Sequence, residues 1–128
     1  MNAIEAALNH VPQIDGMIGA ALVEASTGHV VGTLHTDDHG AVADPAGAVL
    51  AAAATDLVHT LSLLTAQLAT AGPFEELIVA LREQHHLIRP LRAPGHEGLF
   101  LLVTLDRHRA NLALARHQLQ ALESQIVA

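Results

Sequence analysis

The sequence predicts one α+β domain in which helices cover both faces of a single five-stranded antiparallel sheet. Residues 17–23, and most of 98–105, are apolar on both sets of alternate positions, which is typical of strands covered on both faces. The strands fall into two groups whose internal links are short, so neighbours run antiparallel. Helical patterns precede, separate and follow the groups, and 128 residues suffice for one domain, 1–128, with its own core.

The first predicted elements are a short helix over 1–11 and a central strand over 17–24. The helix is indicated by apolar residues at spacings of four and three, namely Ile4, Leu8 and Val11. Asp15 and Gly16 form a turn into the strand.

The second predicted strand covers 29–35, after a turn at 26–28. It is shorter and more polar than the first strand, as an outer strand should be. We expect Val31 in the core, with Val30 and Leu34 on the other face.

A long middle helix is predicted over 45–69, with Asp44 as its cap and Pro45 at its first position. One apolar stripe on this helix consists of Leu50, Leu57, Leu61, Leu64 and Leu68. A second stripe contains Val49, Val58, Leu63 and many alanines. A helix that is apolar on more than one side is usually buried on more than one side.

The third and fourth strands are predicted over 76–81 and 86–92. The third, which reads ELIVAL, is apolar on both faces, and the fourth directs Leu87 and Leu91 to one face and Ile88 to the other. Pro90 lacks an amide donor, so the fourth strand should have a gap, bulge or frayed end there.

The fifth strand, 98–105, is followed by a last helix predicted to run from a cap at Asp106 to about residue 127. Its apolar residues recur at spacings of three and four, which indicates a helix that packs one face on the sheet. These residues are Leu112, Ala115, Leu119, Leu122 and Ile126.

Placing the two most apolar strands centrally predicts the order second, first, fifth, fourth, third. The third strand then lies at an edge, where an exposed apolar strand invites aggregation. A symmetric homodimer that joins third strands and packs the middle helices together resolves this. The alternative is a middle helix buried within its own domain. The predicted interface comprises Val49, Val58, Leu61, Leu63, Glu76, Leu77, Ile78 and Val79.

The stretch 16–28, GMIGAALVEASTG, preceded by a helix and followed by a second strand, resembles the roadblock / dynein light chain family. The middle helix, the three-strand return and the closing helix follow in that family's order, and profilin-like and longin domains have similar elements. The resemblance implies a homodimer with a continuous sheet and a non-catalytic role in regulating or scaffolding small Ras-like GTPases, or in adapting motor complexes. Ten histidines and an acidic loop over 36–44 depart from the family pattern.

Residue chemistry favours no catalytic, metal or cofactor site. There is no cysteine, and the glycines form no phosphate-binding or dinucleotide pattern. The cluster His35, Asp37, Asp38 and His39 has metal-binding residue types, but it is better explained as solvated loop surface. Ten histidines instead predict a charge that changes between about pH 5 and pH 7.

Composition also narrows the classes of partner that the chain could bind. A formal charge of −7 and 2% aromatic residues disfavour nucleic-acid binding. No apolar run suits a membrane span, and no signal-peptide pattern precedes the first helix, so a cytoplasmic protein is expected.

Two function classes remain open on these grounds. The first is a homodimer that binds a small Ras-like GTPase, with Arg82, Arg89 and Arg92 as partner-binding candidates. The second is a profilin-like or PAS-like small-molecule-sensing or adaptor domain, with space left by small residues such as Gly19, Ala20 and Ala21.

Overall fold

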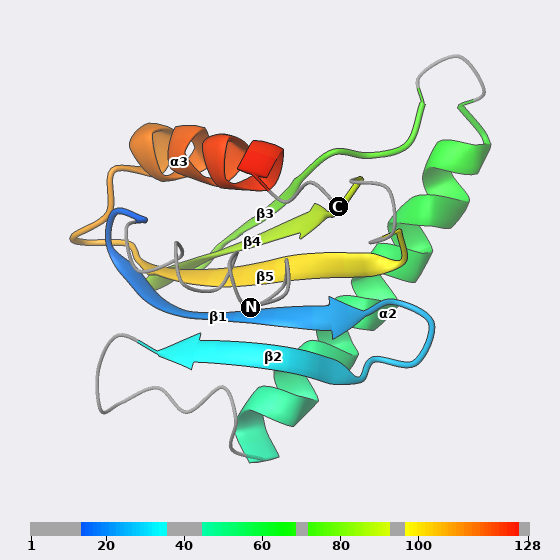
Figure 1. The fold of residues 1–128 in the computed structure, drawn as a ribbon, viewed down its shortest axis with the longest axis horizontal. Coiled ribbons are helices and arrows are strands. Elements are labelled where there is room, and N and C mark those ends of the chain that lie inside the picture. Colours follow the sequence, from blue (N-terminus) through cyan, green and yellow to red (C-terminus); the bar gives the residue numbers. More distant parts are fainter. Residues whose placement is uncertain (1–13, 36–44, 69–71, 93–96, 126–128) are drawn as a thin grey trace.

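The structure, a computed structural model, describes residues 14–35, 45–68, 72–92 and 97–125. It contains one antiparallel sheet of five strands in the order β2-β1-β5-β4-β3, with α2 and α3 on opposite faces (Figure 1). The elements are β1 Met17–Glu24, β2 Val30–His35, α2 Pro45–Ala66, β3 Leu77–Ala80, β4 Gln84–Pro90, β5 Leu99–Asp106 and α3 Leu112–Gln125. The predicted class and strand order are confirmed, while the predicted helix over 1–11 lies outside the described residues.

Two apolar cores lie on the two faces of the sheet, and alternate residues of the central strands supply both. On β1, Ala20 and Leu22 belong to the core beneath α3, whereas Ala21 and Val23 belong to the core beneath α2. This division follows from the two-residue period of a strand. It explains why β1 and β5 are apolar throughout: they lie side by side in the middle of the sheet, and both of their faces are buried.

The prediction that Val31 is a core residue is wrong. Leu22 pairs with Gly32 and Val23 pairs with Val30, so the register shifts at this point. Val31 is the extra residue of this β-bulge. Such a bulge reverses the alternation along the strand. Val30 consequently packs against the core beneath α2, whereas Val31 is 44% exposed.

The fourth strand starts two residues earlier than predicted, at Gln84, and ends at Pro90. The turn before it is tight, since the Leu81 amide donates to the Gln84 carbonyl over 2.8 Å. Pro90 is the final residue of β4, which agrees with the predicted frayed end. Leu87 and Ile88 face opposite cores as expected.

Asp106 does not cap the last helix as predicted. It ends β5, and its carboxylate accepts the amide of His108 and the side chain of Arg109. The hydrogen bond from the His108 amide is the main cause that lowers the pKa of Asp106, and the side chain of Arg109 lowers it further. The cap is Asn111, whose side-chain oxygen accepts the Leu114 amide over 3.0 Å in the N-cap to N3 pattern.

The middle helix α2 spans Pro45–Ala66 and so ends before the predicted residue 69, while its predicted cap Asp44 lies outside the described residues. Gln67 and Leu68 continue only as a tight turn, with amides that donate to Leu64 and Thr65. Ala51, Ala54, Thr55 and Val58 recur at helical spacing and are buried against the sheet.

Gly16 is needed where the chain enters β1. Its φ is +69°, and an added Cβ would lie 2.5 Å from the Cβ of Ala110. We expect Gly16→Ala to lower the free energy of unfolding by about 3 kcal/mol, because backbone strain and steric overlap add. Urea denaturation measures this change. Gly98→Ala is the matched control, since Gly98 has φ +90° but open space, and it should lose only about 1 kcal/mol.

Candidate functional site

A row of leucines runs along α2 and the turn after it, beside the row of residues that faces the sheet. We call Leu50, Leu57, Leu61, Leu64 and Leu68 the leucine face. Leu57, Leu64 and Leu68 are 44%, 56% and 50% exposed. Their spacing places them about a quarter turn around the helix from the sheet-facing row. Several large apolar side chains in one exposed row mark an interaction surface.

The edge strand β3 lies next to this helix face. It pairs with β4 on one side, and no described strand pairs with its other side. Its residues Leu77, Ile78 and Val79 are only half-buried, and Leu81 just after it is 47% exposed. An apolar strand edge without charged side chains is open to pairing with another strand.

A groove of about 140 Å³ joins the leucine face to the β3 edge. Its α2 wall includes Leu57, its β3 wall includes Val79, and His86 of β4 is its one titratable lining residue. The full lining is Leu50, Ala53, Ala54, Leu57, Val79, Leu81, His86, Ile88 and Leu102. The exposed helix row and the free strand edge therefore form one apolar surface.

His86 is held in this groove by two hydrogen-bond partners. Its Nδ1 lies 3.2 Å from the Thr104 hydroxyl oxygen and its Nε2 lies 3.1 Å from Gln84 Oε1. Burial, and to a smaller extent the neighbouring His85, lower the pKa of His86 below its usual 6.5. A neutral imidazole is therefore the favoured form in this groove.

An ion-pair network on the opposite face of the sheet fastens α3 to β4. The Arg89 guanidinium bonds Glu76 at 2.5 Å and Glu123 of α3 at 2.7 Å, and Arg116 bonds Glu76 at 2.6 Å. Arg89 and Glu76 have side chains only 9% and 8% exposed. Burial alone would lower the pKa of Arg89, but the hydrogen bonds with Glu123 and Glu76 outweigh it and raise that pKa.

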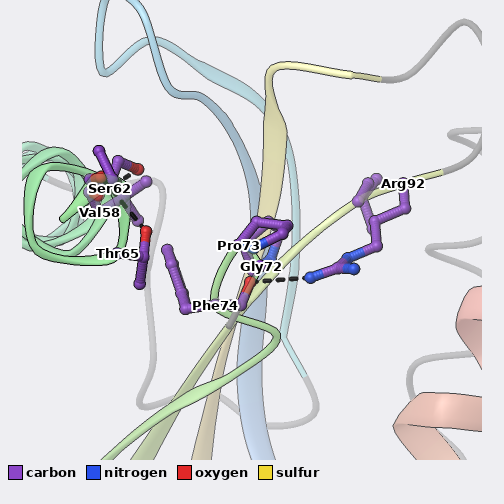
Figure 2. A pocket seen from close by; sticks show the side chains of 10 residues that line it. Val58, Ser62, Thr65, Gly72, Pro73, Phe74 and Arg92 are labelled. Carbon is purple, nitrogen blue, oxygen red and sulfur yellow. Dashed lines mark hydrogen bonds between the residues drawn. The ribbon is translucent and has the colours of Figure 1, made fainter. Parts of the chain in front are cut away.

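A second cavity, of about 500 Å³, lies between the last turns of α2 and the end of β4 (Figure 2). Figure 2 shows Ser62 and Thr65 on its helix side and Arg92 on the far side of Phe74. Both hydroxyls donate to helix carbonyls, so they offer acceptor lone pairs to the cavity. The Arg92 guanidinium donates to the Phe74 carbonyl over 2.9 Å.

The architecture matches solved structures at low sequence identity. The gliding protein MglB of Thermus thermophilus superposes with a TM-score of 0.77 at 17% identity, covering 97% of this chain and 84% of that one. A Roadblock/LC7 domain from Streptomyces avermitilis superposes with a TM-score of 0.72 at 18% identity, covering 92% and 88%. The chain has the roadblock fold. MglC of Myxococcus xanthus gives a TM-score of 0.62 at 19% identity, covering 97% and 96%. No protein-family model and no curated protein matches the sequence.

On this roadblock fold, the residues predicted for a dimer interface divide between the surface and the interior. Leu61, Leu77, Ile78 and Val79 are partly exposed on α2 and β3. Val58 is 6% exposed and packs in the core, and Glu76 is held by the ion-pair network.

The two remaining interface candidates are Leu63 and Val49. Leu63 is 71% exposed, but by helical spacing it points away from the leucine face. The side chain of Val49 lies outside the described residues.

The three arginines predicted for partner binding have different environments in the roadblock fold. Arg82 is exposed in the turn before β4, and Arg92 is exposed just after β4. Arg89 is buried and forms ion pairs with two carboxylates, so its charge is neutralised within the fold.

The loop cluster predicted as solvated surface, with Asp37, Asp38 and His39, lies outside the described residues, as does the side chain of His35. Within the described ranges no three His, Asp or Glu side chains gather as a metal site would require. No helix in the same ranges has the length and apolar character that a membrane span needs.

Sequence reasoning missed Leu81 and His86 as parts of the groove. His86 has the same strand parity as Ile88, so its side chain faces α2, and that parity is the signal in the sequence that could have found it. The small residues Gly19, Ala20 and Ala21, in contrast, line neither cavity.

Proposed function

We propose that the chain is a non-catalytic regulator or scaffold that forms a homodimer and binds a small Ras-like GTPase, whose nucleotide cycle or location it modulates. The observation that carries this proposal is the continuous apolar surface formed by the leucine face and the free edge of β3. The roadblock fold shared with MglB, a gliding protein, and with MglC supports the regulatory role.

A second copy is the occupant that best fits this surface. A strand edge can pair antiparallel with its own copy across a two-fold axis, and this places the same face of both α2 helices on one side of the joined sheet. The apolar edge and the leucine face then become buried together. A solved MglB structure described as a tetrameric arrangement, with a TM-score of 0.77, shows that this fold occurs in assemblies.

The GTPase would contact charged residues at the border of the dimer surface. Arg82 is the strongest candidate because it is exposed in the turn that directly follows β3, whereas Arg89 is buried. A charge at the rim of an interface acts mainly on the association rate and on its salt dependence.

The test uses a small Ras-like GTPase encoded beside this chain and loaded with a fluorescent guanine nucleotide. We expect a complex by light scattering and a changed rate of nucleotide release or hydrolysis. Arg82→Glu should weaken binding by about tenfold and flatten its salt dependence, with no effect on dimerisation. His117→Gln, on the exposed side of α3, is the control and should bind normally. Unchanged nucleotide kinetics together with no complex would contradict the proposal.

The 500 Å³ cavity favours a second candidate function, small-molecule sensing. Its size falls within the range of ligand sites, and it combines an apolar wall with acceptor hydroxyls and one guanidinium. Native mass spectrometry of the purified chain tests this function. A retained small molecule that is lost in Phe74→Ala would support it, and a mass equal to the bare chain would count against it.

A further inference from the structure

The apolar groove is lined by one titratable side chain, His86. His86 lies on the floor of the groove with Ile88 and Leu102, while α2 and β3 form the walls. Every other lining residue is aliphatic. Any apolar group that fills the groove must therefore pack against an imidazole.

The groove has the size of one apolar side chain. Its volume of about 140 Å³ is close to that of cavities that hold a single benzene ring. Its lining includes Leu57 and Val79, which both belong to the surface proposed for the second copy. Continuity with that surface makes an aliphatic side chain of the second copy the occupant that fits.

Within the described residues, the surroundings of His86 offer hydrogen-bond acceptors but no paired carboxylate. Asp106 follows Thr104 at the same strand parity, but its carboxylate accepts the His108 amide and the Arg109 side chain. β5 presents the Thr104 hydroxyl, β4 presents the Gln84 amide oxygen, and β3 and α2 present aliphatic groups. The titratable group that acts on His86 is His85, and it opposes protonation. Among the described ion pairs, none joins His86 to a carboxylate.

We propose that dimer formation is coupled to proton release from His86, so that protonation of this imidazole drives the two copies apart. The proposal rests on the homodimer proposed above and adds its regulation. A second copy that covers the groove removes the remaining water from His86, and this makes the charged form still less favourable.

The direction of the pH effect follows from the linkage between proton binding by His86 and dimer formation. Burial in the monomer already lowers the pKa of His86 below 6.5, and the dimer lowers it further. Between these two values the monomer binds protons that the dimer does not, so the dimer dissociation constant rises as pH falls. Because each dimer contains two such histidines, the rise can reach about a hundredfold per pH unit in this window.

Sedimentation of the full chain at about pH 7.5 and about pH 5.5 tests the proposal. We expect the dissociation constant of the unmodified chain to be higher at the lower pH, because the single chain takes up protons on His86 that the dimer excludes. His86→Gln keeps a hydrogen-bonding side chain without a titrating charge, and its dimer should be equally stable at both values. His117→Gln removes an exposed histidine on α3 and should keep the full response.

The outcomes separate this inference from the function on which it rests. Absence of a dimer at about pH 7.5 would overturn the homodimer itself. A dimer of equal affinity at both pH values, or a response that persists in His86→Gln, would overturn only the role of His86.

A second measurement keeps the test independent of variant folding. Calorimetric dilution of the unmodified chain near pH 6, in buffers of different ionisation enthalpy, counts the protons released on association. We expect a release of up to about two protons per dimer. A value of zero would refute the coupling.

Discussion

Arg89→Met is expected to lower the free energy of unfolding by about 3 to 5 kcal/mol, the largest stability loss that we predict. Arg89 joins Glu76 and Glu123, and its removal leaves carboxylates without their main cation on the face that holds α3. Arg116 still neutralises part of the charge on Glu76, which favours the lower end of the range. Urea denaturation followed by circular dichroism measures the change.

The matched control is Arg92→Met, two residues beyond the end of β4. Arg92 has a side chain that is 47% exposed, its carboxylate partner Glu75 lies 4.0 Å away, and surface pairs of this kind contribute little. We expect a loss below about 1 kcal/mol. Replacing Arg89, Glu76 and Glu123 together by Met, Gln and Gln should recover part of the stability, because no buried charge is then left alone. Equal losses for Arg89→Met and Arg92→Met would contradict the importance of the network.

Leu64→Glu should raise the dimer dissociation constant by at least about a hundredfold without unfolding the chain. Leu64 is 56% exposed in the single chain, so its replacement costs the fold little. In a two-fold dimer built on the leucine face, the same substitution places two carboxylates in an apolar contact, which is strongly unfavourable. Sedimentation at several concentrations measures the constant.

The adjacent residue provides a close control. Leu63 is 71% exposed and lies on the same helix, but it points about 100° away from Leu64. Leu63→Glu should change the dissociation constant by less than about threefold. If both glutamates disrupted the dimer equally, or if neither did, the leucine face would not be the interface.

Strand order could be predicted because a strand that is buried on both faces has a recognisable sequence pattern. Residues 17–23 have apolar residues at nearly every position, and this occurs where helices cover both sides of a sheet. β3 is equally apolar yet lies at an edge, and the conflict between these two facts is what points to a dimer.

Local details were predicted less well because they depend on interactions that local patterns do not encode. The bulge opposite Val23 reversed the predicted faces of Val30 and Val31. Asp106 has the residue type of a cap, but its carboxylate is used in the turn before Asn111. The first error comes from assuming an unbroken alternation along the strand, and the second comes from choosing a cap by residue type alone.

The ion-pair network could not be predicted from local spacing. Arg89 meets Glu76 across 13 positions and Glu123 across 34 positions of the chain. Only the stacking of α3 on β4 brings these charges together, so Arg89 resembled a surface cation in the sequence. Its burial explains why an exposed arginine such as Arg82 is the better candidate for partner contact.

The molar mass of the unmodified chain at micromolar concentration and about pH 7.5 tests the central claim most directly. Sedimentation equilibrium should give about twice the 13.4 kDa of the single chain, because the proposed homodimer buries the leucine face and the β3 edge. A mass of 13.4 kDa at every concentration tested would contradict the account, since the apolar surface on α2 and β3 would then remain without a partner.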